Sequence, residues 1–220
     1  CKACKRECPL GVDMAALKAE TLAVSHDLHG VPTRARLFAA VRRLNALGSA
    51  LAPLSNLPGR SRLTRTLAER VLGVAAARPL PRFRRDTLLR WLASRRAPAG
   101  PFPLGEVVFL ADSFTTWTEP AIPIAAVELL ELAGWRVRVE QSGCCGRASI
   151  SKGLLDQASE LAARMSARLA PFAERGVPIV GVEPSCLLTL RDEHVALHPE
   201  DPAAAAVARW AISSDPRPTP

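Results

Sequence analysis

Residues 107–182 alternate between short apolar runs and longer amphipathic stretches, and this alternation limits the fold more than any other feature. The run 107–111 is apolar throughout, as is typical of a strand buried on both faces of a parallel sheet. The spans 135–139 and 178–182 predict two further strands, with a helix before each of them. The order strand, helix, strand, helix, strand predicts a parallel α/β fold.

The first of these helices is expected to start near Pro120, with Thr118 as its N-cap, and to stop at Gly134. Its buried face is expected to hold Ile122, Ala126, Leu129 and Ala133. The second helix is expected over 151–174. Its apolar residues are in helical register at Leu154, Ala158, Leu161, Met165, Leu169 and Phe172.

Upstream of this pattern the sequence predicts helices and no strands. They are expected over 13–29, where Asp13 is the N-cap, and over 34–51, 61–77 and 86–95. The predicted buried faces of the second and third helices consist of Leu37, Val41, Leu44, Leu47, Leu63, Leu67, Val71 and Val74. The span 97–103, rich in Pro and Gly, is the clearest boundary in the chain. We therefore expect the helical half to be a linker packed on its neighbours, without a core of its own.

The chain begins with three cysteines at a spacing typical of iron–sulfur ligation. Cys1, Cys4 and Cys8, followed by a proline, read C-x2-C-x3-C-P. They match the last three cysteines of the ferredoxin-type run C-x2-C-x2-C-x3-C-P, which ligates [4Fe–4S] clusters. Zinc also binds at C-x2-C and is the alternative. Because the first cysteine of the run would lie upstream of residue 1, we expect the chain to be a piece of a longer protein.

A second group of cysteines follows the predicted strands. Cys144 and Cys145 lie in the loop 141–150, and Cys186 lies in the loop 183–187. Because ligand sites in parallel α/β folds gather at the carboxyl ends of the strands, we expect these three thiols to meet at one edge. Gly143 and Gly146 would let the backbone approach a bulky ligand. Burial as small apolar side chains is one alternative, and thiol–disulfide chemistry at the adjacent pair is another.

Three charged residues lie beside these loops. Asp112 follows the first predicted strand and is either a capping residue or part of the site. Arg147 and Lys152 lie close to the cysteine pair. They either neutralise a cluster or an acidic substrate, or they are ordinary surface charges.

Positive charge is concentrated in the middle of the chain. Residues 31–100 hold 15 Arg, no Lys, and only two acidic residues, a formal charge of +13. Since the whole chain carries +8, the remainder carries −5. The span is either a compositional surface or a contact for an acidic partner or an anionic membrane. Few aromatic residues interrupt it, which disfavours nucleic acid. No apolar run approaches the roughly 18 residues that a membrane span needs, and clustered thiols favour a cytoplasmic protein with metal or redox chemistry.

Four stretches together resemble the iron–sulfur part of flavin-linked 2-hydroxyacid dehydrogenases. These proteins include FAD-dependent D-lactate and D-2-hydroxyglutarate dehydrogenases, and the iron–sulfur subunits of glycolate oxidase and glycerol-3-phosphate dehydrogenase. The stretches are 1–9, 112–120, 143–156 and 182–192. The resemblance covers most of 1–20 and 104–210, and within 31–100 only the helical character is similar.

The resemblance implies a division of the chain into four parts. These are a partial [4Fe–4S] segment over 1–30, an Arg-rich helical linker over 31–100, one copy of a cysteine-rich α/β domain over 104–210, and a tail over 211–220. It also implies electron transfer from FAD, held in an upstream flavin-binding domain or subunit, to a quinone or cytochrome. The chain alone would not oxidise substrate and would have no catalytic residue. Peripheral contact with the inner face of the membrane, through the Arg-rich span, is part of the same expectation.

The resemblance further implies that Cys144, Cys145 and Cys186 hold a second cluster or form a redox site, with Gly143 and Gly146 in the cluster loop. Two positions depart from the pattern, because Asp112 and Thr189 stand where the family often has cysteine. A non-enzymatic zinc-binding interaction module, docking through the Arg-rich span, is the alternative function.

Overall fold

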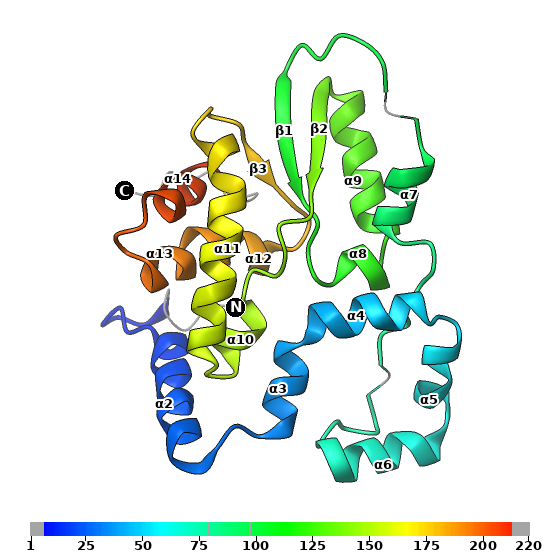
Figure 1. Cartoon of the computed structure of the whole chain (residues 1–220), viewed down its shortest axis with the longest axis vertical. Helices are drawn as coiled ribbons and strands as arrows, with labels where there is room; N and C mark the ends of the chain where they lie inside the picture. Colours follow the sequence, from blue (N-terminus) through cyan, green and yellow to red (C-terminus); the bar gives the residue numbers. More distant parts are fainter. Residues whose placement is uncertain (1–6, 79, 97, 213–220) are drawn as a thin grey trace.

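A three-stranded parallel sheet lies at the centre of the computed structural model, which describes residues 7–78, 80–96 and 98–212 (Figure 1). Strand β1 (Gly105–Leu110) pairs along its whole length with β2 (Trp135–Glu140) and at two residues with β3 (Ile179–Val180). The order is β2-β1-β3 and both pairs are parallel. The predicted parallel α/β core is therefore confirmed.

The central strand is buried on both faces, as its continuous apolar sequence requires. Val108 and Leu110 join a core formed with α11 (Leu155–Ala173), α12 (Pro184–Arg191) and α14 (Pro202–Trp210). Phe109 and Ala111 point the other way and join a core formed with α7 (Leu88–Ser94) and α9 (Ala121–Leu132). Figure 1 shows these two groups of helices on opposite sides of the sheet.

Helix α2 (Met14–His29) forms as predicted and packs on the cysteine-containing half. The carboxylate of Asp13 accepts hydrogen bonds from the backbone N–H groups of Ala15 and Ala16, each at 3.1 Å. Ala19 is buried in a small cluster with Ile150, which belongs to α10 (Arg147–Ser151), and with Ala158 of α11. The segment that follows Cys8 is thus fixed to the α/β core.

The single helix expected over 34–51 is wrong, because the chain forms α3 (Thr33–Ala39) and α4 (Val41–Ala50), which are separated by Ala40. The predicted face is also wrong: Leu44 and Leu47 are exposed, and α4 buries Asn45, Gly48 and Ser49 instead. The reason is the polar backbone that α4 covers. Asn45 Nδ2 donates to the carbonyl of Ser113 at 2.6 Å, and Ser49 Oγ donates to the carbonyl of Trp117 at 3.4 Å.

The chain then turns through η1 (Leu54–Asn56) and α5 (Leu57–Arg60) into α6 (Arg62–Leu72). Helix α6 ends earlier than the expected 77, because Gly73 adopts the left-handed conformation that stops a helix. The leucines of α6 lie on the predicted helix, but the other described residues do not bury them: Leu63 is 79% exposed and Leu67 is 59% exposed. Helices α4 to α6 thus present leucines beside the arginines of this span.

The N-cap predicted at Thr118 is wrong, because this residue ends the short helix α8 (Thr115–Thr118) and donates to the carbonyl of Phe114. The face predicted for α9 is wrong as well. Its buried residues are Pro123 and Val127, whereas Ile122, Leu129 and Ala133 are exposed. Apolar side chains surround this helix, so periodicity alone does not select the side that meets the sheet.

The helix predicted over 151–174 forms as α11, which begins four residues later than expected. The short helix α10 precedes it, and a turn at residues 152–154 separates the two. The predicted register holds for Ala158, Met165 and Leu169, which are fully buried. Helix α13 (Glu193–Leu197) follows α12, and after α14 the backbone N–H of Ile212 donates to the carbonyl of Ile179. Most of the tail predicted over 211–220 lies outside the described residues. The part of the chain that the structure describes forms no helix with the length and apolar character needed to cross a bilayer.

Candidate functional site

Three buried thiols lie at the edge of the sheet where the strands end. Cys144 and Cys145 precede α10, and Cys186 lies in the first turn of α12. The Sγ atoms of Cys145 and Cys186 are 3.3 Å apart, although 41 residues separate them in the sequence. The predicted convergence of these two loops is therefore confirmed.

Both thiols of the adjacent pair favour the neutral form. The pKa of Cys144 is raised, first by its interaction with the Cys145 thiol and then by burial. At Cys145 the hydrogen bond with Cys144 favours the thiolate, but the bond with Cys186 and complete burial outweigh it, so this pKa is raised too. A metal that binds here has to displace protons from these thiols.

The two glycines around the pair play different roles. Gly143 has a φ of +105°, and a Cβ placed on it would meet no atom within 4 Å, so the space next to this residue is open. Gly146 has a φ of +80° and forms the N-terminal boundary of α10. A Cβ there would lie 3.3 Å from the carbonyl oxygen of Ala158, so Gly146 serves the packing of α10 on α11.

Asp112 is a capping residue, as one of its two predicted roles required. Its carboxylate accepts from the N–H groups of Phe114 at 2.7 Å and Thr115 at 2.9 Å, and also from the Thr115 hydroxyl. The neighbouring Ser113 is buried, and its hydroxyl has no hydrogen-bond partner of normal geometry among the described residues, yet it lies near enough to Cys144 to favour the thiolate. The hydroxyl of Ser142, two residues before Cys144, is also buried and has no hydrogen-bond partner in the described part of the chain.

The cation of this site comes from α4 and not from the residues next to the cysteines. Arg147 pairs with Glu193, and the Lys152 ammonium lies 5.0 Å from the centre of the Phe38 ring. Arg42 instead donates from Nη1 to the carbonyl of Ala111 at 3.1 Å, at the end of the central strand. Arg42 is not among the site residues predicted from the sequence. The available signal was its spacing from the polar residues three and seven positions later, which places all three on one helical face.

The N-terminal cysteines are described only in part. Cys1 and Cys4 lie outside the described residues. Cys8 is a half-buried free thiol six residues before α2. Its pKa is lowered by backbone N–H groups, that of Val12 most, followed by that of Leu10. Donors of this kind favour the thiolate form that metals bind.

The cysteines at the sheet edge have the right chemistry to bind a metal or cluster through thiolates. Their present arrangement is not that of a metal site. Soft thiolates are the ligands of iron–sulfur clusters, and three cysteines occur here. Within residues 7–78, 80–96 and 98–212, however, no group of three or more His, Cys, Asp or Glu side chains is arranged to hold a metal ion. Cys145 and Cys186 are close enough to share one ligand.

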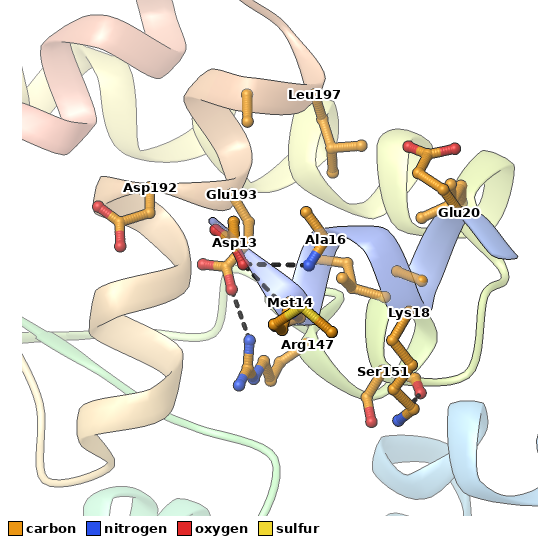
Figure 2. A pocket seen from close by; sticks show the side chains of 15 residues that line it. Asp13, Met14, Ala16, Lys18, Glu20, Arg147, Ser151, Asp192, Glu193 and Leu197 are labelled. Carbon is orange, nitrogen blue, oxygen red and sulfur yellow. Dashed lines mark hydrogen bonds and ion pairs between the residues drawn. The ribbon is translucent and has the colours of Figure 1, made fainter. Parts of the chain in front are cut away.

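A cavity of about 470 Å³ lies between α2, α10, α11 and α13 (Figure 2). Its walls are apolar at Met14, Ile150 and Leu197, and its charged members include Lys18 and Arg147. Figure 2 shows Lys18 directed toward Ser151, whose carbonyl accepts from Nζ at 3.2 Å. The described residues that line this cavity include none of the cysteines, so it is separate from the thiol site.

Comparison with known proteins relates the chain to dehydrogenases. It is 26% identical over 204 aligned residues to D-2-hydroxyglutarate dehydrogenase of Escherichia coli strain K12, covering 88% of this chain and 20% of that protein. The enzyme of the same name from Haemophilus influenzae is 24% identical with the same coverage. One subunit of the anaerobic glycerol-3-phosphate dehydrogenase of Escherichia coli strain K12 is 24% identical over 153 residues, covering 69% of this chain and 38% of its own length.

The chain thus spans about a fifth of the length of the D-2-hydroxyglutarate dehydrogenases that it matches. No protein-family model and no solved structure matches the sequence. The similarity to dehydrogenases that the sequence stretches implied is confirmed, and the iron–sulfur clusters stay a prediction.

Proposed function

We propose that this chain is the electron-transfer portion of a flavin-dependent 2-hydroxyacid dehydrogenase of the D-lactate or D-2-hydroxyglutarate type, which passes electrons from FAD to an acceptor. One structural observation supports this most. Helix α2, which begins six residues after Cys8, packs on α10, which begins two residues after Cys145. The segments that follow Cys8 and Cys145 therefore pack on the same core, which suits a relay between two redox groups.

In this proposal Cys1, Cys4 and Cys8 hold a [4Fe–4S] cluster, and Cys144, Cys145 and Cys186 hold a second cluster or act as a redox site. A bound cluster supplies one-electron storage. The protein contributes the surroundings: backbone N–H groups near Cys8 favour its thiolate, and burial keeps water from Cys145 and Cys186. Gly143 provides the open space for a bulky ligand, and Gly146 belongs to the same cluster loop.

The remaining parts of the proposed enzyme lie outside this chain. FAD and the hydroxyacid substrate bind to an upstream flavin-binding domain or subunit, and a quinone or a cytochrome accepts the electrons. No residue of this chain is assigned a catalytic role. The proposed division into 1–30, 31–100, 104–210 and 211–220 follows the same pattern, and the protein works in the cytoplasm.

The Arg-rich span is proposed to contact the inner face of the membrane. On α6 the exposed leucines Leu63 and Leu67 lie on the same short helix as Arg62 and Arg65. Arginines beside exposed leucines suit an anionic lipid surface, since charge attracts the helix and apolar side chains insert. We expect the protein to sediment with vesicles that contain phosphatidylglycerol and not with pure phosphatidylcholine. The double variant L63Q/L67Q should lose this binding, and equal binding by the parent and the variant would contradict the contact.

The proposed electron transfer is tested by metal analysis of the full-length protein, with its flavin partner, purified without oxygen. Iron and acid-labile sulfide are measured in the parent and in the variants Cys8→Ser and Cys186→Ser. We expect both elements in the parent and a loss of part of them in each variant. Zinc without sulfide would favour the zinc-binding interaction module. A parent protein without iron and sulfide would contradict the proposal.

A further inference from the structure

Helix α4 covers the carboxyl end of the central strand β1. It lies next to α8 in Figure 1, and three polar side chains connect it to the loop that follows β1. Arg42, Asn45 and Ser49 donate to the carbonyls of residues 111, 113 and 117, in that order. Helix α4, which belongs to the predicted linker, is thus hydrogen-bonded at three positions to the segment after β1. Ser113 of this segment lies beside Cys144.

Arg42 is the member of this face that carries charge. Its guanidinium lies over the Trp117 ring, 4.9 Å from the centre, and donates to the Ala111 carbonyl. Burial lowers the pKa of Arg42, and this effect is opposed by the charges of Cys144, Asp112, Cys186 and Cys145. The guanidinium therefore lies within electrostatic range of all three thiols and of the nearest carboxylate.

The charge of the site changes when a metal binds. When the thiols bind a metal, their protons pass to solvent, and the metal–thiolate complex carries net negative charge with Cd²⁺ or with an iron–sulfur cluster. Asp112 adds another negative charge nearby. In a buried site such charge is unfavourable unless a cation opposes it.

We propose that Arg42 is a positioning residue of the thiol site, which holds α4 over the site and offsets the negative charge of whatever the thiolates bind. The inference rests on the proposed function, since it assumes that Cys144, Cys145 and Cys186 bind a metal or cluster. It also assigns part of the Arg-rich span to the site and not to a linker.

Arg43 provides a matched control, because it is the adjacent residue of the same helix and is exposed. The experiment compares Arg42→Gln, Arg42→Lys and Arg43→Gln in the full-length protein with its flavin partner. Iron held at this site is the difference in iron per chain between the parent and Cys186→Ser. The Cd²⁺ affinity of this site is measured on the reduced, iron-free protein from the thiolate charge-transfer absorption that the parent shows beyond that of Cys186→Ser. The midpoint potential of the loaded protein is measured by titration.

We expect Arg42→Gln to weaken Cd²⁺ binding by about 10- to 100-fold, as is typical when a supporting group of a metal site is lost. Its iron at this site should fall, and its midpoint potential should become more negative, because a nearby positive charge favours the reduced state. Arg42→Lys should recover most of the affinity and the potential. Arg43→Gln should match the parent.

Three other results would contradict the proposed role of Arg42. If Arg42→Gln keeps the affinity, the iron and the potential of the parent, Arg42 has no role at the site. If Arg42→Lys fails as fully as Arg42→Gln, the guanidinium acts as a structural bond and not as a charge. If the parent and Cys186→Ser hold equal iron and bind Cd²⁺ equally, the proposed metal site itself is wrong, and the inference falls with it.

Discussion

The Nε2 atom of His194 lies 2.9 Å from the carbonyl oxygen of Cys145, and both residues are buried. With a carbonyl as partner, Nε2 carries the proton, and Nδ1 then accepts from the Ser166 hydroxyl at 3.2 Å. The ring therefore connects α13 to α11 and to the cysteine loop. This single side chain fixes the backbone from which Cys145 projects.

Replacing His194 by Ala should lower the free energy of unfolding by about 2–4 kcal/mol, because it leaves a cavity and an unsatisfied buried carbonyl. Urea unfolding, followed by circular dichroism, measures the loss. His29→Ala is the control, since His29 is exposed on α2 and should cost less than about 0.5 kcal/mol. Equal stability of the two variants would show that the His194 bridge does not stabilise the fold.

The same histidine predicts a dependence of stability on pH. Burial lowers the pKa of His194 below its usual 6.5; the charge of His198 adds to this effect, and the bond to Cys145 opposes it. The unfolded chain therefore binds this proton at a higher pH than the folded chain does. The free energy of unfolding should fall as the pH drops below about 6.5. In His194→Gln, which cannot titrate, the slope between pH 7.5 and 5.5 should be smaller; an unchanged slope would assign the effect to other groups.

Gly153 sets how closely α2 approaches the core. A Cβ at this residue would lie 2.5 Å from the Cβ of Leu22 and 2.8 Å from the backbone nitrogen of Ala23, so Gly153→Ala must push α2 outward. We expect faster hydrogen exchange across residues 14–29 in this variant. Gly73→Ala is the control, because its φ of +65° resembles the +68° of Gly153 while its Cβ would meet only ordinary contacts. Both variants carry backbone strain of about 1–2 kcal/mol. Only the difference between them in hydrogen exchange of α2 therefore reports the contact of residue 153 with Leu22 and Ala23.

Arg95 and Glu131 connect α7 to α9. Two parallel hydrogen bonds of 2.7 Å join the guanidinium and the carboxylate, and Arg95 also stacks on Trp91 at 4.2 Å. Because both side chains are mostly buried, Arg95→Ala should lower stability by about 1–3 kcal/mol. The exposed neighbour Arg96 should tolerate Ala within about 0.5 kcal/mol. Thermal or urea unfolding of the two variants tests this, and similar losses would contradict the role of the pair.

Local signals predicted the elements well. Asp13 caps α2 because the capping bond depends only on neighbouring residues, and strand β1 follows from an apolar run that is too short for a helix. Parallel topology then placed Cys145 and Cys186 at the same edge. Each of these inferences depends either on interactions between residues close in sequence or on a general rule of sheet topology.

The buried face of each helix and its contacts were harder to predict, because they depend on the segment against which the helix packs. Helix α4 covers backbone carbonyls, so Asn45 is buried there and Leu47, at 61% exposure, is not. Arg42 and Arg43 look alike in the sequence, and only the docking of α4 on the loop after β1 distinguishes them. The cation that reaches the thiols was therefore beyond the reach of pattern analysis.

The bonds from Asn45 and Arg42 to the loop after β1 bear on how this protein can be cut and recombined. A fusion that joined the chain at residue 104 would follow the break in composition, yet it would discard three donors that the loop requires. Its carbonyls at Ala111 and Ser113 would then open to solvent. The smallest piece that can be grafted onto another protein with its thiols in the same surroundings starts near residue 41, not after the proline-rich span.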